Sequence, residues 1–353
     1  MAETNATILI PDISGFTEFM TSNELSHASH AINMLIDAML DAVGEEYEVS
    51  EIEGDALLLI KKGIAPSKKE IFDTCINIFN AFHFQRKWLQ QHTICPCGAC
   101  QAIIDLSLKF VAHHGPLAEI KIGKFIKQSG PEMIVAHRLL KNSINNHEYL
   151  LLTEKLLEQS IDTPETLQME WISSSEEYAS IGKIDYRFLL LNDVRKKVPE
   201  PPEPQKYYRT DNSSYLEINI EANFHDVYMV IMDIPGRYKW IKGLKSVTQD
   251  PPTAYIGSTH TCVFEDYEAT ISPLRMNATD EGIIYAESCN IKNMNLSLVY
   301  EFVFKNTGKQ SCIFAARILN VSESPLPEEI KMPLFQKLQK LARDLKTYCE
   351  KKE

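Results

Sequence analysis

Several features are scarce in this 353-residue chain, and each scarcity excludes a class of protein. No apolar stretch approaches the roughly 20 residues that a membrane-spanning helix needs, so no membrane span is expected. Lys and Arg number 36 against 48 Asp and Glu, and the net charge of -12 argues against a nucleic-acid partner. The start, MAETNATILIPDIS, has no basic segment and only a short apolar run, so we expect no signal peptide and a cytoplasmic location. Eight cysteines do not make a disulfide scaffold in a chain of this length.

Proline is concentrated in the stretch VRKKVPEPPEPQKYY, residues 194–208, which holds four prolines among charged residues. Such a composition is typical of a stiff, exposed connector. Because 353 residues exceed what one compact core usually organises, two domains are expected. The sequence therefore predicts a first domain over residues 1–193, a linker over 194–208 and a second domain over 209–353.

The two predicted domains differ in their pattern. The first begins with a strand at 6–12, a helix at 25–43, a hairpin at 46–63 and a helix at 68–91. It continues with β-structure near 102–112 and 118–127 and a helix at 131–142. This mixture predicts an α+β sandwich with helices on a largely antiparallel sheet. In the second, several long strands precede an amphipathic helix at about 326–351, which predicts a curved sheet wrapped on one long helix.

Two aspartates stand at strand ends in the first domain. Asp12 ends the apolar run ILIP and Asp55 lies in the turn of the hairpin, next to Gly54. If the two carboxylates converge, they could hold a pair of divalent cations, either Mg²⁺ or Mn²⁺, which is the arrangement used to activate a hydroxyl and brace a triphosphate. The alternative is that each aspartate only forms a turn or a cap.

Four segments of the first domain, read in order, resemble the landmark motifs of class III adenylate and guanylate cyclases. They are DISGFT at 12–17, EIEGDAL at 51–57, VAHHGP at 111–116 and GPEMIVAHRL at 130–139. The resemblance implies a ferredoxin-type α/β sandwich over about residues 5–160 and a site formed between two protomers, hence a homodimer. It also implies that Asp12, the backbone of Ile13 and Asp55 bind two metal ions, and that Arg138 braces the transferred phosphoryl group of a nucleoside triphosphate.

The sequence departs from the family at the positions that hold the nucleotide. Ile134 stands where the family has a ribose-binding asparagine, and an apolar side chain cannot replace its hydrogen bonds. Glu51 and Lys127 stand at the base-reading positions, with charges swapped relative to the adenine-reading pair. They either read an unusual base or pair with each other in a degenerate site. Arg138 is equally well interpreted as a surface cation beside an apolar helix face.

A cysteine cluster lies at HTICPCGAC, residues 92–100. His92, Cys95, Cys97 and Cys100 could complete a tetrahedral Zn²⁺ site, and a redox pair or free thiols are the alternatives. Class III cyclases have no such insertion, although it resembles that of an uncharacterised bacterial branch of cyclase-like proteins.

The start of the second domain, YLEINIEANFHDVYMVIMDIPGRYKW at 215–240, resembles the polyketide-cyclase/START-like (SRPBCC) superfamily. The resemblance implies a helix-grip fold whose cavity holds a hydrophobic small molecule or lipid. Tyr285, Tyr300, Phe302 and Phe314 alternate along strands and either line that cavity or fill the core.

Together these features predict a cyclase-like signalling protein that binds, and in one interpretation cyclises, a nucleoside triphosphate with divalent metal, coupled to a hydrophobic-ligand domain. That interpretation makes it a nucleotidyl cyclase, a phosphorus–oxygen lyase. The alternative is a catalytically inactive nucleotide- or lipid-binding module whose cyclase-like domain serves as a dimerisation scaffold.

Overall fold

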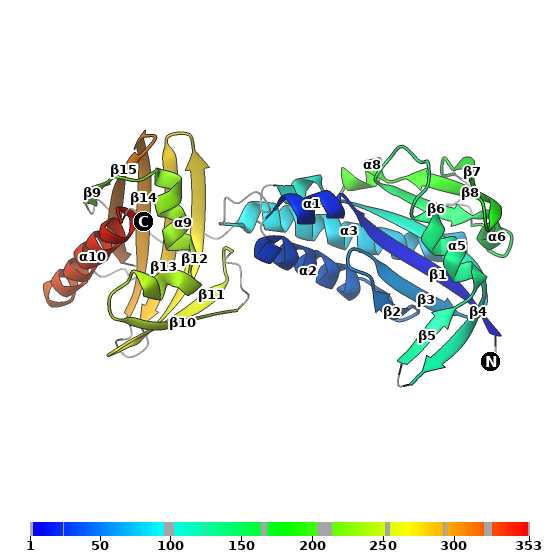
Figure 1. Cartoon of the computed structure of the whole chain (residues 1–353), viewed down its shortest axis with the longest axis horizontal. Helices are drawn as coiled ribbons and strands as arrows, with labels where there is room; N and C mark the ends of the chain where they lie inside the picture. The colour runs from blue at the N-terminus through cyan, green and yellow to red at the C-terminus, as the bar shows by residue number, and fades with distance from the viewer. Residues whose placement is uncertain are drawn as a thin grey trace. The chain divides into compact units, whose positions relative to one another are not determined.

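The computed structural model divides the chain into two compact units (Figure 1). The first unit comprises Met1–Gln90 and Cys97–Pro201, and the second comprises Gln91–Pro96 and Pro202–Glu353. The structure describes residues 3–23, 25–94, 102–123, 125–163, 168–202, 214–250, 255–291, 294, 296–320 and 327–351. The break between Pro201 and Pro202 falls inside the proline-rich stretch of the sequence.

The first unit is built on an eight-stranded sheet of order β2-β3-β1-β4-β6-β8-β7, with β5 paired to β4. The elements of this part of the chain are β1 (Glu3–Ser14), α1 (Phe16–Ser22), α2 (Leu25–Asp41), β2 (Glu48–Ile52), β3 (Leu57–Lys62), α3 (Lys68–His92), β4 (Ser107–Ile122), β5 (Phe125–Ser129), α5 (Pro131–Leu139), β6 (Tyr149–Thr153), α6 (Glu154–Leu157), β7 (Ile172–Tyr178), β8 (Gly182–Leu190) and α8 (Asn192–Arg195).

The central strands have the β-α-β-β-α-β order of a split β-α-β sandwich. β1 pairs antiparallel with β3 on one side and with β4 on the other, and β2 closes the edge beside β3. β1 is buried on both faces, since Leu9 packs into the core under α2 and α3 while Ile8 and Ile10 pack into a second, smaller core with Met133 of α5. Side chains alternate along a strand, so one apolar run can serve two cores. The predicted α+β class is confirmed for this unit.

Two predicted boundaries in the first unit were wrong. The separate strands expected near 102–112 and 118–127 are largely one strand, β4, which continues through Pro116 because Gly115 and Leu117 keep pairing with β1. The helix expected to reach residue 142 ends at Leu139, and Asn142 instead donates its side-chain amide to the Leu139 carbonyl. A local hydrogen bond of this kind competes with helix continuation.

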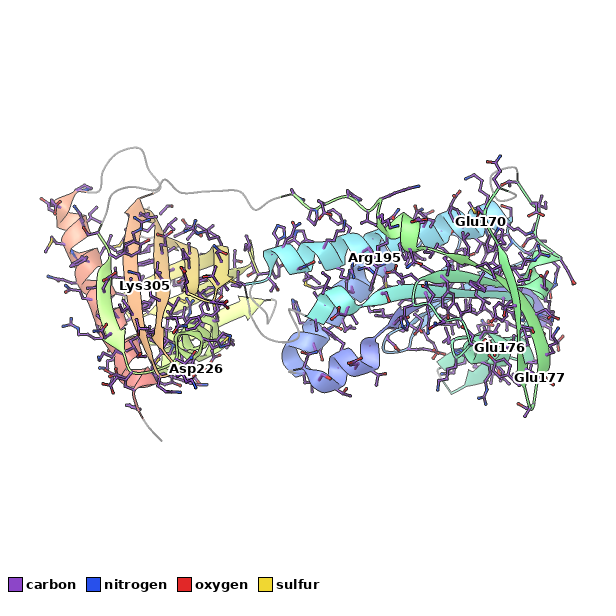
Figure 2. The ribbon with its side chains drawn as sticks, turned by 90° about the horizontal axis from the view of Figure 1, so that it is seen from above. Glu170, Glu176, Glu177, Arg195, Asp226 and Lys305 are labelled. Atoms are coloured by element: carbon purple, nitrogen blue, oxygen red, sulfur yellow. The ribbon has the colours of Figure 1, made fainter. Side chains whose placement is uncertain are left out.

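Near the end of the first unit, α8 is tied to the loop before β6. Arg195, labelled in Figure 2, donates to the buried carboxylate of Glu148 at 3.0 Å. Glu148 is 2% exposed, so an ionised partner offsets part of its desolvation.

The second unit has a seven-stranded antiparallel sheet of order β10-β11-β12-β13-β14-β15-β9. Its elements are β9 (Leu216–Ile220), α9 (Phe224–Met232), the 3₁₀ turn η2 (Pro235–Lys239), β10 (Leu244–Asp250), β11 (Thr259–Phe264), β12 (Glu268–Thr279), β13 (Gly282–Ile291), β14 (Leu296–Gly308), β15 (Ser311–Asn320) and α10 (Glu328–Cys349). α10 buries Leu334, Leu338 and Leu345 at helical spacing, and the last two join the core of the sheet. The predicted sheet with one long C-terminal helix is confirmed.

A short segment from earlier in the chain belongs to the second unit. Ile94 is fully buried in that unit's core, and the Tyr228 hydroxyl donates to its carbonyl oxygen. The Ile256 N–H donates to the carbonyl of His92 at 2.8 Å. Sequence analysis did not predict that residues this far upstream would complete the second core.

Candidate functional site

The fold brings Asp12 and Asp55 to neighbouring positions in the first unit. Asp12 forms an isolated bridge with Ala56, and the Ile13 N–H donates to the Asp55 carbonyl at 2.9 Å. The β2–β3 turn that carries Asp55 is made by Gly54, whose φ of 76° favours a residue without a side chain. The end of β1 and the hairpin turn are therefore held together by backbone pairing, and we call the two aspartates the acidic pair.

A lysine that sequence reasoning missed lies against the acidic pair. Lys109 on β4 is directly opposite Asp12 in the register, and its Nζ is 3.1 Å from Asp12 Oδ2 and 3.1 Å from the Leu140 carbonyl. Burial raises the pKa of Asp12, Lys109 opposes that rise, and the charge of Asp55 adds to it. Burial also raises the pKa of Asp55. The buried carboxylate of Asp12 and the partly buried carboxylate of Asp55 thus share one nearby ammonium, and the surplus negative charge favours a cation.

The donor chemistry of the acidic pair fits Mg²⁺ or Mn²⁺ only together with a further ligand. Among the described residues, no group of three or more His, Cys, Asp and Glu side chains is arranged to hold a metal ion. Mg²⁺ is commonly held by one or two carboxylates together with substrate phosphates. Asp12 and Asp55 match that kind of partial site, in which a phosphate completes the coordination.

The two base-reading candidates pair with each other. Lys127 Nζ lies 3.1 Å from Glu51 Oε2, between the side chains of β5 and β2. Ile134, at the expected ribose position, is 55% exposed on α5. Arg138 is exposed on the same helix, and its backbone carbonyl accepts from the Tyr178 hydroxyl at 2.9 Å. Within this one chain, Glu51 and Lys127 are therefore occupied with each other and are not free to hydrogen-bond a purine base.

Three of the four zinc candidates, Cys95, Cys97 and Cys100, lie outside the described residues. The fourth, His92, is the last residue of α3 and is 6% exposed.

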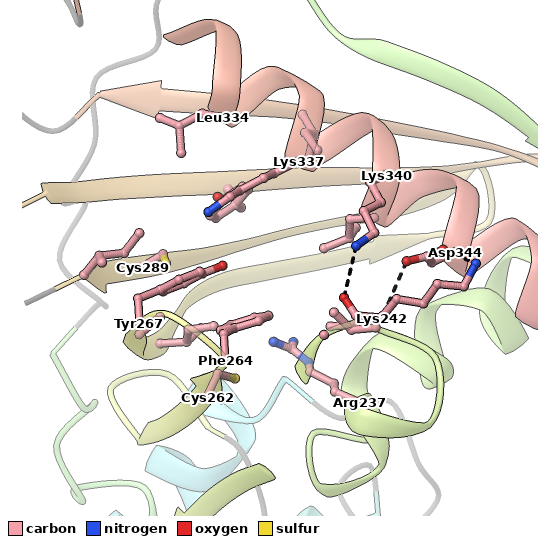
Figure 3. A pocket seen from close by; sticks show the side chains of 18 of the residues that line it. Arg237, Lys242, Cys262, Phe264, Tyr267, Cys289, Leu334, Lys337, Lys340 and Asp344 are labelled. Atoms are coloured by element: carbon pink, nitrogen blue, oxygen red, sulfur yellow. Dashed lines mark hydrogen bonds and ion pairs between the residues drawn. The ribbon is translucent and has the colours of Figure 1, made fainter. Parts of the chain in front are cut away.

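The second unit contains a cavity of about 310 Å³ between the sheet and α10 (Figure 3). Tyr300 and Phe302, two of the predicted pocket residues, line it. Tyr285 and Phe314 instead lie in the packed core beside it, where each has its ring near that of Phe302, at centroid distances of 6.1 and 5.8 Å. Phe264 and Tyr267 stack on each other at its wall, with ring centroids 4.5 Å apart.

One wall of the cavity is polar and was missed in the sequence. Arg237 and Glu287, 3% and 4% exposed, form a two-pronged ion pair with N–O distances of 3.2 and 2.8 Å. The Tyr285 hydroxyl donates to Glu287 Oε2 at 2.8 Å. A sign of this wall was present in β13, because Glu287 stands in the alternating inward series that also contains Ile283, Tyr285 and Cys289. His260 does not line the cavity but contacts Arg237 at 3.3 Å. We call the two lining residues, Arg237 and Glu287, together with His260 the polar wall.

Comparisons with known proteins give this chain no established activity. The family model described as "Protein of unknown function (DUF2652)" matches residues 32–149. The chain is 27% identical over 168 residues, 47% of its length and 77% of the relative, to the uncharacterized protein Rv2561/Rv2562 of Mycobacterium tuberculosis.

Two of the solved structures that resemble this chain are a guanylyl cyclase and a START superfamily protein. The guanylyl cyclase Cya2 matches 53% of this chain and 92% of its own, at 13% identity and a TM-score of 0.37. A START superfamily protein from Mycobacterium smegmatis matches 39% of this chain and 96% of its own, at 12% identity and a TM-score of 0.31. Because both TM-scores lie below 0.5, these likenesses do not identify the fold of either unit.

No described helix is both long enough and apolar enough to pass through a bilayer.

Proposed function

We propose that this chain is a two-part binding and sensing protein. In this proposal a class III cyclase-like unit binds a metal–nucleotide complex without cyclising it, and a START-like helix-grip unit holds a small molecule. The observation that carries the proposal is the ion pair between Lys127 and Glu51, 3.1 Å apart. Because Lys127 and Glu51 pair with each other, neither of these two side chains is left free to select a base.

The position of Ile134 supports the absence of turnover. In-line attack on a phosphate requires the ribose hydroxyl to be held within about 3–3.5 Å of the reacting atom. A side chain without a donor or acceptor cannot hold a ribose in place, and Ile134 exposes 55% of its surface at that point. The first unit then retains phosphate binding while lacking the means to orient the sugar.

The acidic pair supports binding of the triphosphate. Asp12, Asp55 and the backbone of Ile13 would hold the divalent cations, which supply charge neutralisation to the phosphates. Lys109, 3.1 Å from Asp12, is placed to turn its ammonium toward a phosphate oxygen once a cation neutralises the carboxylate.

A second candidate function, an active nucleotidyl cyclase, is favoured by the convergence of Asp12 and Asp55. It would work as a homodimer, because Arg138 is exposed on α5 and a second copy of the chain could receive it. In that case Arg138 would stabilise charge on the transferred phosphoryl group of the partner's nucleotide.

The deciding experiment incubates the purified chain with ATP, GTP, CTP or UTP and Mn²⁺, and separates the products by chromatography. We expect no cyclic nucleotide, together with Mn²⁺-dependent retention of nucleotide in equilibrium dialysis. Asp12→Asn, which removes a metal-binding charge at constant shape, should abolish that retention.

Asp193→Asn is the matched control, because the Asp193 side chain is 85% exposed on α8 and pairs with the nearby Lys196 at 2.7 Å. It should retain nucleotide like the unaltered chain. A cyclic product that disappears in Asp12→Asn would establish the active cyclase instead. Absence of both product and retention would rule out any nucleotide role.

A further inference from the structure

The guanidinium group of Arg237 has one donor left over at the cavity. Its Nε donates to the Ile231 carbonyl at 2.9 Å, and each terminal nitrogen donates one hydrogen to Glu287. Nη1 also contacts His260 Nε2 at 3.3 Å. Arginine has five N–H donors, so one, on Nη2, has no partner in the described part of the chain. Arg237 is 97% buried, lines the cavity, and points its guanidinium inward in Figure 3.

The polar wall nevertheless has no net charge. Burial by itself would raise the pKa of Glu287, but the charge and hydrogen bonds of Arg237 hold that pKa below its ordinary value, so both partners are ionised at neutral pH. Burial and the charge of Arg237 lower the pKa of His260 to about 4, so His260 is neutral and its ring nitrogen can accept from Arg237. An anionic ligand placed here would therefore be a buried charge without a counterion.

The remaining cavity surface gives no reason to expect an anion either. Four Lys or Arg and four Asp or Glu are among the lining residues, so the charges balance. Lys337 lies over the ring of Tyr267, with its Nζ 4.3 Å from the centroid, and Lys242 pairs with Asp344 at 3.2 Å. The other surface is largely aliphatic, aromatic or thiol, from residues such as Phe302, Cys262 and Leu338.

The volume sets the size of the occupant. An apolar cavity of about 150 Å³ holds one benzene ring. A cavity of about 310 Å³ therefore accommodates a body of two fused rings.

We propose that the cavity takes a neutral, largely apolar molecule of about two fused rings that carries one oxygen acceptor, a ketone or similar carbonyl, directed at the free N–H of Arg237. This inference rests on the proposed role of the second unit as a small-molecule binder and adds the chemistry of the molecule. The carbonyl oxygen accepts the fifth hydrogen bond of Arg237, and the rings contact the apolar walls. An acid of the same shape is disfavoured because Glu287 already neutralises Arg237.

Three probes with the same ring system test this inference by titration calorimetry on the full chain: 1-indanone, indane and indane-1-carboxylate. We expect 1-indanone to bind at least about 10-fold more tightly than indane, since a hydrogen bond from a charged donor is stronger than a neutral one. The carboxylate should bind more weakly than the ketone. The carbonyl stretch of bound 1-indanone should move to lower frequency than in hydrocarbon solvent.

The variants separate the polar wall from the rest of the unit. The double variant Arg237→Met with Glu287→Met replaces the ion pair by apolar side chains of similar length, a change that folded proteins often tolerate. It should bind indane as before and lose the preference for 1-indanone. Arg275→Met is the control, because Arg275 pairs with Glu301 at 2.8 Å away from the cavity lining, and it should keep the roughly 10-fold preference.

The outcomes distinguish this inference from the proposed function. If no probe binds, the small-molecule role of the second unit fails. If indane and 1-indanone bind equally, or the carboxylate binds most tightly, the role stands and the inference is overturned. If the double variant does not fold, an unshifted carbonyl stretch in the unaltered protein would overturn the inference by itself.

Discussion

At the scale of single residues, both units place charged side chains where water is scarce, but they neutralise them differently. The acidic pair has two carboxylates and one nearby ammonium, Lys109, which leaves room for a cation. The polar wall matches Glu287 to Arg237 one to one, which leaves room only for a neutral acceptor. The sequence marks each of these residues as charged. Strand register sets Lys109 opposite Asp12, whereas Arg237 reaches Glu287 on β13 from the turn η2.

The buried histidine of the polar wall makes stability depend on pH. Its folded pKa of about 4 lies below its ordinary value of 6.5, so between these values the unfolded chain takes up a proton that the folded chain does not. Stability should therefore fall as the pH falls from about 6.5 to about 4, by roughly 3 kcal/mol from this residue.

Urea unfolding at pH 7, 5.5 and 4 checks this prediction by comparing the unaltered chain with His260→Gln. Glutamine keeps an acceptor for Arg237 and does not titrate, so the variant should lose less stability on acidification. His83, whose pKa is also lowered by burial, to about 2, contributes to both proteins and cancels in the difference. An identical pH dependence in the two proteins would contradict the assignment.

At the scale of elements, the sequence predicted kinds of element better than their ends. The hairpin around Gly54 and the helices α2, α3 and α10 were expected from turn residues and apolar spacing, which are local properties. β4 was expected as two stretches of β-structure, yet the residues between them, Gly115, Pro116 and Leu117, all pair with β1. Pairing with a distant strand overrides a local preference.

The turn between β12 and β13 depends on a glycine for steric reasons. Gly282 has a φ of 150°, and a Cβ placed there would lie 2.1 Å from the Phe304 carbonyl oxygen. Gly282→Ala should therefore destabilise the protein by more than about 2 kcal/mol, because backbone on the neighbouring strand must move. The measurement is the free energy of unfolding in urea.

Gly182→Ala is the matched control in the other unit. Gly182 has a φ of 85° and open space around its Cβ, so only the backbone strain of a left-handed residue is expected, about 1 kcal/mol. Equal losses in the two variants would mean that the strand contact at Phe304 is relaxed in solution.

At the scale of the whole molecule, neither compact unit is one continuous stretch of the chain, because each comprises two separate segments. The second unit includes residues 91–94, where Ile94 is 0% exposed within its core. Ile94→Ala should cost the second unit about 2–4 kcal/mol, as for other large-to-small changes in a core.

Hydrogen exchange read by mass spectrometry locates that loss. Exchange should become faster in β13 and β14 and stay unchanged in β1 and β4. Ile64→Ala, at a position 89% exposed, should alter neither. Faster exchange in β1 after Ile94→Ala would contradict the assignment of Ile94 to the core of the second unit.

The sequence by itself determined the α+β class of the first unit, the long strands and C-terminal helix of the second, and the aspartates at strand ends, because each follows from local periodicity and turn chemistry. Only the tertiary structure decided that Lys127 pairs with Glu51, that Lys109 pairs with Asp12, and that one N–H donor of Arg237 has no partner among the described residues. The two ion pairs join residues 76 and 97 positions apart in the sequence, and the third case depends on which of the five N–H donors of Arg237 are used. No local pattern encodes the distance between two side chains that meet through different elements.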